Sequence, residues 1–190
     1  QATNAPHMLF SEDNVVAKFN HNKSQWGLFY NLSARNFKKT YTDIDETYVL
    51  ENKTIHRVQE GLHDQNKHFT HNIDLSYNLT EQDKYVFNVV FRNSVYDAPC
   101  LNQSNKLYDA ADADNYIFSR LKNKQSSYTP SLDLYYQRTL PKNQMLTMSV
   151  TGTLMHTDNN RLYHEYTPQA EDLAMIETDV TGNKRSIIGE

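Results

Sequence analysis

The segment "DAADADN" at residues 109–115 brings the carboxylates of Asp109, Asp112 and Asp114 close together. Such oxygen ligands are those that Ca²⁺ prefers. The segment lacks the ligand spacing, the central glycine and the final glutamate of an EF-hand loop, so it predicts a solvated acidic loop and no metal site. The shorter acidic segment "DIDE" at 43–46 predicts a surface turn.

Four histidines, His56, His63, His68 and His71, fall within sixteen residues of one another. His68 and His71 are the pair whose imidazoles could share a transition metal if the chain folded back. In a strand, however, positions i and i+3 point to opposite faces. The pattern therefore predicts polar surface histidines, with no metal ligand among them.

His156 and His164 flank the polar segment "TDNNRLY", where they could contact a small ligand. We take polar and aromatic side chains of the expected loops as candidate ligand-binding residues. They are Tyr108, Asp112, Asp114, His156, Asn160, Arg161, Tyr163 and His164.

No residue set indicates catalysis. The chain has no Ser/His/Asp grouping in a motif context, no glycine-rich phosphate loop and no nucleophile elbow. Cys100 follows "DAP" in an expected loop without a neighbouring histidine, so we interpret it as an incidental thiol. We expect no enzyme and no cofactor. Four Asn-X-Ser/Thr sequons, at Asn31, Asn52, Asn78 and Asn102, are explained by chance in an asparagine-rich chain.

Composition limits the class of protein. The 190 residues carry a net charge of −4 with scattered Lys and Arg, which argues against a nucleic acid partner. A mean hydropathy of −0.78 would suit a disordered chain. The aromatic content of 12%, with 13 Tyr and 8 Phe, is too high for a disordered chain and indicates a folded one. No segment marks an internal boundary, so residues 1–190 are expected to form one unit.

The elements that position the candidate ligand-binding residues are expected to be strands. Apolar residues alternate with polar ones along the chain, and a period of two is that of a β-strand. From Leu146 the apolar face carries Met148, Val150, Gly152 and Leu154, with Ser and Thr between them. The same two-faced pattern recurs along the chain. Its segments are 26–35, 73–79, 85–92, 132–137 and 146–154.

The connections alternate between short and long, which predicts an antiparallel meander. Short polar turns are expected at 20–25, 80–84, 140–144 and 181–184. Long polar loops are expected at 40–66, 96–128 and 157–173. The first should contain a hairpin, "TYVL-ENKT-IHRV", and residues 107–121 are the one candidate for a helical turn or two.

Two readings of this meander remain open, a transmembrane β-barrel and a soluble β-sandwich. Strands of ten or more residues match the roughly 9–11 residues that a tilted membrane-crossing strand needs. Trp26, Tyr77, Tyr85 and Tyr136 lie on the apolar face near the short turns, as in an interfacial aromatic girdle. No apolar run is long enough for a membrane-spanning helix, and no signal peptide is evident at the N-terminus. "RSIIGE" ends the chain in a strand-like pattern, so we expect a fragment of a longer protein.

Residues from about 26 to 190 resemble the barrel of TonB-dependent outer-membrane receptors of Gram-negative bacteria. The resemblance rests on "HNIDLSYNLTEQDKYVFNVVFRN", "TPSLDLYYQRTLPKNQMLTMSVTGT" and "HTDNNRLYHEY". It implies a fragment of a barrel of roughly 22 strands, without the plug domain that fills it. It further implies partners: outer-membrane lipid, the plug and remaining strands, a periplasmic energy-coupling protein and an extracellular small ligand.

The expected function is therefore part of a receptor barrel in the outer membrane that takes up an extracellular nutrient such as a sugar or a siderophore. The alternative is a soluble, secreted all-β module that binds carbohydrate through the same tyrosine-rich segments. Such a module should fold cooperatively in buffer, whereas a piece of a barrel should need detergent or self-association.

Overall fold

The computed structural model describes residues 2–5, 10–50 and 53–190. Within them the chain is all-β, with antiparallel strands and one short 3₁₀ turn, η1 (Pro141–Asn143). The strands of the first half are β1 (Ala2–Ala5), β2 (Phe10–His21), β3 (Ser24–Thr40), β4 (Ile44–Leu50) and β5 (Lys53–Leu62). The later strands are β6 (Asp64–Glu81), β7 (Tyr85–Asp109), β8 (Asp112–Leu140), β9 (Gln144–Tyr166) and β10 (Asp172–Gly189).

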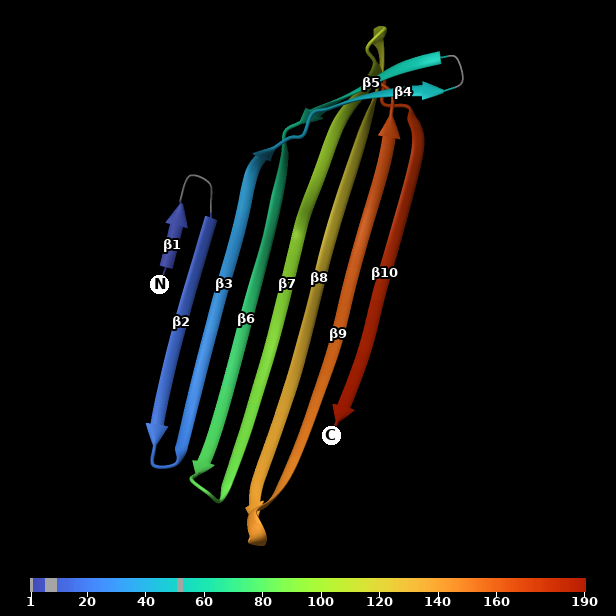
Figure 1. Cartoon of the computed structure of the whole chain (residues 1–190). Helices are drawn as coiled ribbons and strands as arrows, with labels where there is room; N and C mark the ends of the chain where they lie inside the picture. Colours follow the sequence, from blue (N-terminus) through green and yellow to red (C-terminus); the bar gives the residue numbers. More distant parts are fainter. Residues whose placement is uncertain (1, 6–9, 51–52) are drawn as a thin grey trace.

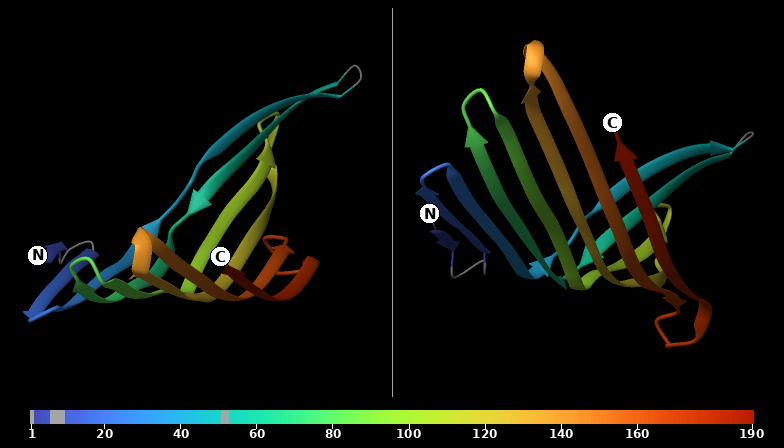
Figure 2. Two further views of the ribbon diagram at one scale, coloured as in Figure 1. Left: turned by 60° about the horizontal axis from the view of Figure 1, so that its bottom comes forward. Right: turned by 90° about the horizontal axis from the view of Figure 1, so that it is seen from below.

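The strands form one open sheet in the order β1-β2-β3-β6-β7-β8-β9-β10 (Figure 1). Each neighbouring pair is antiparallel, so the predicted meander is confirmed. β1 and β10 lie at the two edges of this path, and the sheet curves as an arc (Figure 2). The predicted hairpin is also confirmed: β4 pairs with β5, which in turn pairs with the far end of β7.

The short turns gather at one end of the sheet (Figure 1). Three of the four predicted turns are confirmed, between β2 and β3, β6 and β7, and β8 and β9. Asn22 and Asp83 adopt positive φ values of 51° and 60° in two of them, a conformation that Asn and Asp tolerate better than most residues. The fourth turn, at 181–184, was wrong, because β10 runs through it while paired with β9.

Most of the expected long loops are paired strands instead. Residues 107–121 contain no helix. β7 continues to Asp109 and β8 begins at Asp112, so the two strands are joined by a tight turn at Ala110 and Ala111. Cys100 lies in β7, where its thiol donates to the Gln65 carbonyl. "DIDE" is mostly strand, since only Asp43 precedes β4. In the third stretch, β9 extends to Tyr166 and leaves a short loop before β10. Backbone pairing across neighbouring strands thus overrides the low strand propensity of these polar segments.

Strand register places the apolar faces of successive strands on the same side of the sheet. Trp26 pairs with Tyr77, Tyr77 with Val89, Val89 with Leu134, and Leu134 with Val150. Cross-strand partners point to the same face. We call the resulting surface the apolar band. Its residues are Trp26, Leu28 and Tyr30 on β3, Ile73, Leu75 and Tyr77 on β6, Phe87, Val89 and Phe91 on β7, Leu132, Leu134 and Tyr136 on β8, and Leu146, Met148, Val150 and Leu154 on β9.

The four aromatic residues singled out in the sequence lie toward the short-turn end of this band. The rings of Trp26 and Tyr77 are 4.3 Å apart between centroids, and Tyr77 meets Phe87 edge-on. Phe87 in turn pairs with Tyr136 on β8. Tyr85 lies at the start of β7, beside the turn.

The opposite face, here called the polar face, is joined by hydrogen bonds and charge pairs. Asn72 donates to Asn31, and Asn31 donates to Asn14, so side-chain amides link three strands. Arg92 on β7 forms an ion pair with Asp133 on β8. These contacts pair polar side chains across neighbouring strands of this face.

The apolar band has no second layer packed against it in the described chain. Ala98 and Leu107 are the buried apolar side chains of the described residues, and neither belongs to the band. Trp26 is 53% exposed, Leu75 45% and Met148 51%. The sheet therefore presents a wide apolar surface, far more than scattered single residues would. Among the described residues no helix is long and apolar enough to cross a membrane.

Candidate functional site

The residues proposed from the sequence lie at the end of the sheet opposite the short turns, but they do not form one site. On β9, His156, Asn160 and His164 share the face of the apolar band, whereas Arg161 and Tyr163 lie on the polar face, because side chains alternate along a strand. A ligand cannot touch both groups at once. Alternation separates what the linear segment "TDNNRLY" brings together.

The acidic turn at the tip of β7 and β8 is exposed. Asp112 and Asp114 lie at the start of β8, and Asp109 caps the turn by accepting a hydrogen bond from the Ala111 amide at 3.0 Å. Nowhere in the described ranges do three His, Cys, Asp or Glu side chains gather in a way that could hold a metal ion. Tyr108 lies beside this turn, with the Lys106 ammonium 4.9 Å from its ring centre.

His156 is the first residue of β9 beyond the apolar band on that face. Its ring stacks on Tyr128 at 5.0 Å, and its two nitrogens lie 2.7 Å from oxygens of Asn183 and Asp158. The hydrogen bonds to Asn183 and to Asp158 raise the pKa of His156. The hydrogen bond to Asn183 also ties β9 to β10 at this position.

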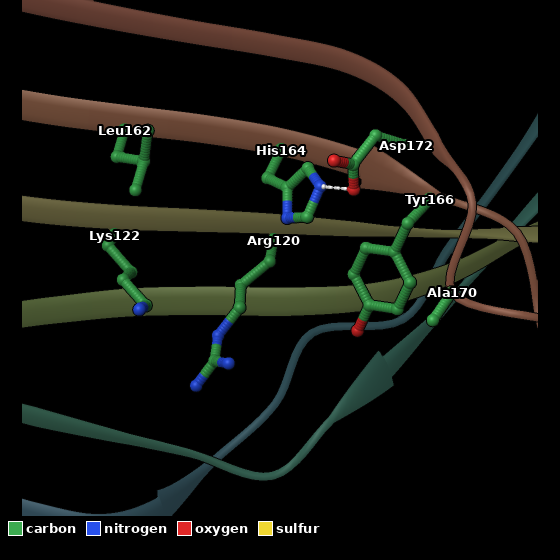
Figure 3. Close-up of a pocket in the computed structure, with 7 residues that line it drawn as sticks. All are labelled: Arg120, Lys122, Leu162, His164, Tyr166, Ala170 and Asp172. Carbon is green, nitrogen blue, oxygen red and sulfur yellow. Dashed lines mark hydrogen bonds and ion pairs between the residues drawn. The ribbon is translucent and has the colours of Figure 1, made fainter.

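His164 belongs to a small pocket on the same face, of about 240 Å³ (Figure 3). Its Nε2 lies 2.7 Å from a carboxylate oxygen of Asp172, and its ring lies 5.0 Å from that of Tyr166. Arg120 and Lys122 extend from β8 into the same space (Figure 3). The pocket carries charges of both signs, from Arg120 and Lys122 and from Asp172.

A larger pocket lies between the β4–β5 hairpin and the far ends of β7, β8 and β9. We call it the hairpin pocket. It is an open depression with a volume of about 430 Å³, within the range of roughly 300–1,000 Å³ typical of small-ligand sites. Its lining residues are Tyr48, Ile55, Arg57, Leu107, Tyr108, Asp109, Asn115, Ile117 and Glu165. Leu107 and Ile117 supply apolar surface, while Arg57 and Glu165 supply opposite charges.

Tyr163 stands beside the hairpin pocket and donates a hydrogen bond from its hydroxyl to Glu165. Burial of the phenol, and then this hydrogen bond, raise the pKa of Tyr163 to about 12, while Arg57 acts in the opposite direction. The hydrogen bond from Tyr48 to Glu46 likewise raises the pKa of Tyr48. Both phenols therefore stay neutral at physiological pH. Their hydroxyl protons are engaged by Glu165 and Glu46, so each ring can stack against a ligand and each hydroxyl oxygen can accept a hydrogen bond from one.

Sequence reasoning missed Arg57, Tyr48 and Glu165. Arg57 reaches this place because it pairs with Asp109 across β5 and β7, a contact between residues that lie far apart in the chain. No local pattern around "IHRV" indicates that pairing. Of the residues proposed from the sequence, Tyr108 lines the hairpin pocket and Tyr163 adjoins it.

The hairpin pocket combines charged, polar and apolar side chains. A guanidinium, a carboxylate and neutral phenols surround an apolar floor, which suits a polar small molecule held by hydrogen bonds and stacking. No family model, curated protein or solved structure matches the chain.

Proposed function

We propose that the chain is part of the barrel of a TonB-dependent receptor in the outer membrane of a Gram-negative bacterium. In this proposal the apolar band contacts lipid, the polar face looks into the barrel, and the hairpin pocket forms part of the outer vestibule that binds an extracellular nutrient. The plug, the remaining strands and a periplasmic coupling protein are the other partners.

The observation that carries the proposal is the exposed apolar band. Its register is continuous from β3 to β9, and large side chains such as Trp26 and Met148 are half exposed. In water such a surface is an aggregation hazard. In a bilayer it is the stable arrangement, because lipid solvates apolar side chains while the ladders satisfy the backbone.

The placement of long and short connections agrees with this orientation. Outer-membrane barrels have short periplasmic turns and longer extracellular segments. Here tight turns gather at one end, and the hairpin and the long extensions of β7 and β8 lie at the other (Figure 1). The hairpin pocket then faces the outside, where a nutrient arrives.

The chain's single tryptophan tests the proposal. Trp26 lies on the apolar band, so its fluorescence should be quenched by lipids brominated on their acyl chains when the chain is folded into vesicles. The matched control joins Trp26→Phe with Phe29→Trp, which moves the indole to the polar face of the same strand. We expect this control to resist the lipid quencher and to respond to a water-soluble one.

Equal quenching of both proteins would refute a lipid-facing band. A monomer that folds cooperatively in buffer, with emission unchanged by detergent, would instead favour the soluble carbohydrate-binding module.

A further inference from the structure

The β4–β5 hairpin leaves the main sheet at a junction of three chain segments. The end of β3, the passage from β5 to β6, and the last part of β7 meet there, with Thr40 paired to Asp64 and Leu62 paired to Ser104. The Gly61 amide donates to Asp43 at 2.8 Å, which holds the two hairpin strands at their base. We call this junction the hairpin base.

Asp64 is the buried charge of the hairpin base. The residue is only 9% exposed. One carboxylate oxygen, Oδ1, accepts a hydrogen bond from the Ser104 hydroxyl at 3.2 Å, while Oδ2 is buried and has no hydrogen-bond partner. None of the ion pairs formed by the described residues includes Asp64.

A buried carboxylate without a counter-charge is unfavourable, and proteins resolve this by pairing it or by coordinating a metal ion. A cation bound at Asp64 would supply this counter-charge. The cavity that Asp64 lines indicates which kind of cation fits.

Asp64 lines a cavity of about 130 Å³ whose polar groups are hydroxyls and amides. Its lining residues are Thr40, Tyr41, Thr42, Leu62, Asp64, Asn66, Asn102, Gln103 and Ser104. The lining residues come from three segments, and all except Leu62 carry a side-chain oxygen, without a thiol or an imidazole among them. Oxygen donors of mixed type, with water completing the shell, are the ligands of Ca²⁺. At about 30 Å³ per water molecule, the cavity has room for an ion and a few waters.

We propose that the hairpin base binds one Ca²⁺ ion, with the Asp64 carboxylate as its charged ligand and neutral oxygens of the neighbouring residues and water as the others. This inference does not depend on the proposed receptor function, because it needs only the junction itself. The ion ties three segments together and so sets the angle at which the hairpin projects over its pocket.

The first test is a titration of the folded chain, in detergent, with Tb³⁺. Tyr41 lines the cavity and serves as the antenna that sensitises Tb³⁺ emission. Ca²⁺ should displace Tb³⁺ with a Kd of roughly 10⁻⁴–10⁻³ M, as in sites with few charged ligands, and Mg²⁺ should compete poorly. Far-UV circular dichroism verifies that each preparation keeps its sheet.

Asp64→Asn keeps the size of the side chain and removes its charge, so Ca²⁺ affinity should fall roughly tenfold or more. The matched control is Asp112→Asn, which removes an exposed carboxylate from the acidic turn and should leave the affinity unchanged. Binding that survives Asp64→Asn, or falls with Asp112→Asn, would overturn the proposal.

A second measurement needs no variant. Ca²⁺ should slow hydrogen–deuterium exchange in the peptides covering residues 40–45 and 60–64, and leave exchange near the Ala110 turn unchanged. A folded chain that shows neither this protection nor sensitised Tb³⁺ emission has no cation site at the hairpin base.

Discussion

Val150 and Thr151 provide the sharpest test of the two faces, because they are consecutive residues of β9 that point in opposite directions. Val150 lies at the centre of the apolar stretch 146–154 and is 39% exposed. Its cross-strand neighbours are Leu134 and Gly189, so no carboxylate lies beside it to pair with a new positive charge. Thr151 pairs with Asp133 on the polar face.

We expect Val150→Arg to destabilise the chain in lipid by about 2–4 kcal/mol, the cost measured for arginine near the midplane on the lipid face of a barrel. At about 1.4 kcal/mol per factor of ten, this is a loss of roughly 30- to 700-fold in the folding equilibrium. Thr151→Arg should lie within about 0.5 kcal/mol of the parent, because its side chain enters water on the polar face.

Urea unfolding in vesicles of fixed lipid composition, followed by Trp26 emission, measures both free energies of unfolding. The two variants are directly comparable, since they place the same side chain at consecutive positions of one strand and differ only in the face of the sheet that carries it. Equal losses, or a larger loss for Thr151→Arg, would show that the apolar band does not face lipid. A small loss for Val150→Arg in a soluble monomer would place that face in water.

Three further predictions concern local contacts. Gly61→Ala should destabilise the hairpin base by roughly 1–3 kcal/mol, because a Cβ there would lie 2.6 Å from the Thr42 backbone nitrogen; Gly152→Ala meets no atom within 4 Å and should be neutral in the same unfolding assay. Ultraviolet titration should show Tyr163 ionising near its pKa of about 12. Because folding raises this pKa, the contribution of neutral Tyr163 to the free energy of unfolding is present below pH 10 and disappears as the pH rises toward 12. Hydrogen bonds from Lys84 and Lys23 lower the pKa of Glu81 to about 2. The contribution of ionised Glu81 to the free energy of unfolding is therefore present above pH 4.5 and disappears as the pH falls toward 2. A Glu81 carboxyl chemical shift that titrates near 4.5 would contradict this.

Much of the sheet follows from local pattern. Alternation in segments such as 146–154 predicts a strand and its two faces, because side chains of an extended chain must point alternately up and down. Polar turn residues such as Asn22 and Asp83 predict where strands reverse. These are properties of a few consecutive residues, so sequence reasoning can find them.

Strand ends are another matter. Residues around Cys100 and Asp112 read as loop or helix, yet they lie in strands, because each strand adopts the extended form wherever its neighbour offers hydrogen-bond partners. The segment 181–184 likewise has the composition of a turn. It is strand because its backbone pairs with β9. Pairing with a distant segment decides these regions, and local propensity is the weaker influence.

The candidate site shows the division most clearly. The sequence alone determined that polar and aromatic residues such as Tyr108, Tyr163 and His164 lie beyond the apolar stretches of the chain. The tertiary structure decided that β9 continues through Tyr163 and His164, whose side chains then alternate, and that Arg57 joins Glu165 at one pocket. Alternation is local, whereas the meeting of Arg57 and Glu165 depends on the register of β5 against β7 and of β8 against β9, and a register is a property of paired strands.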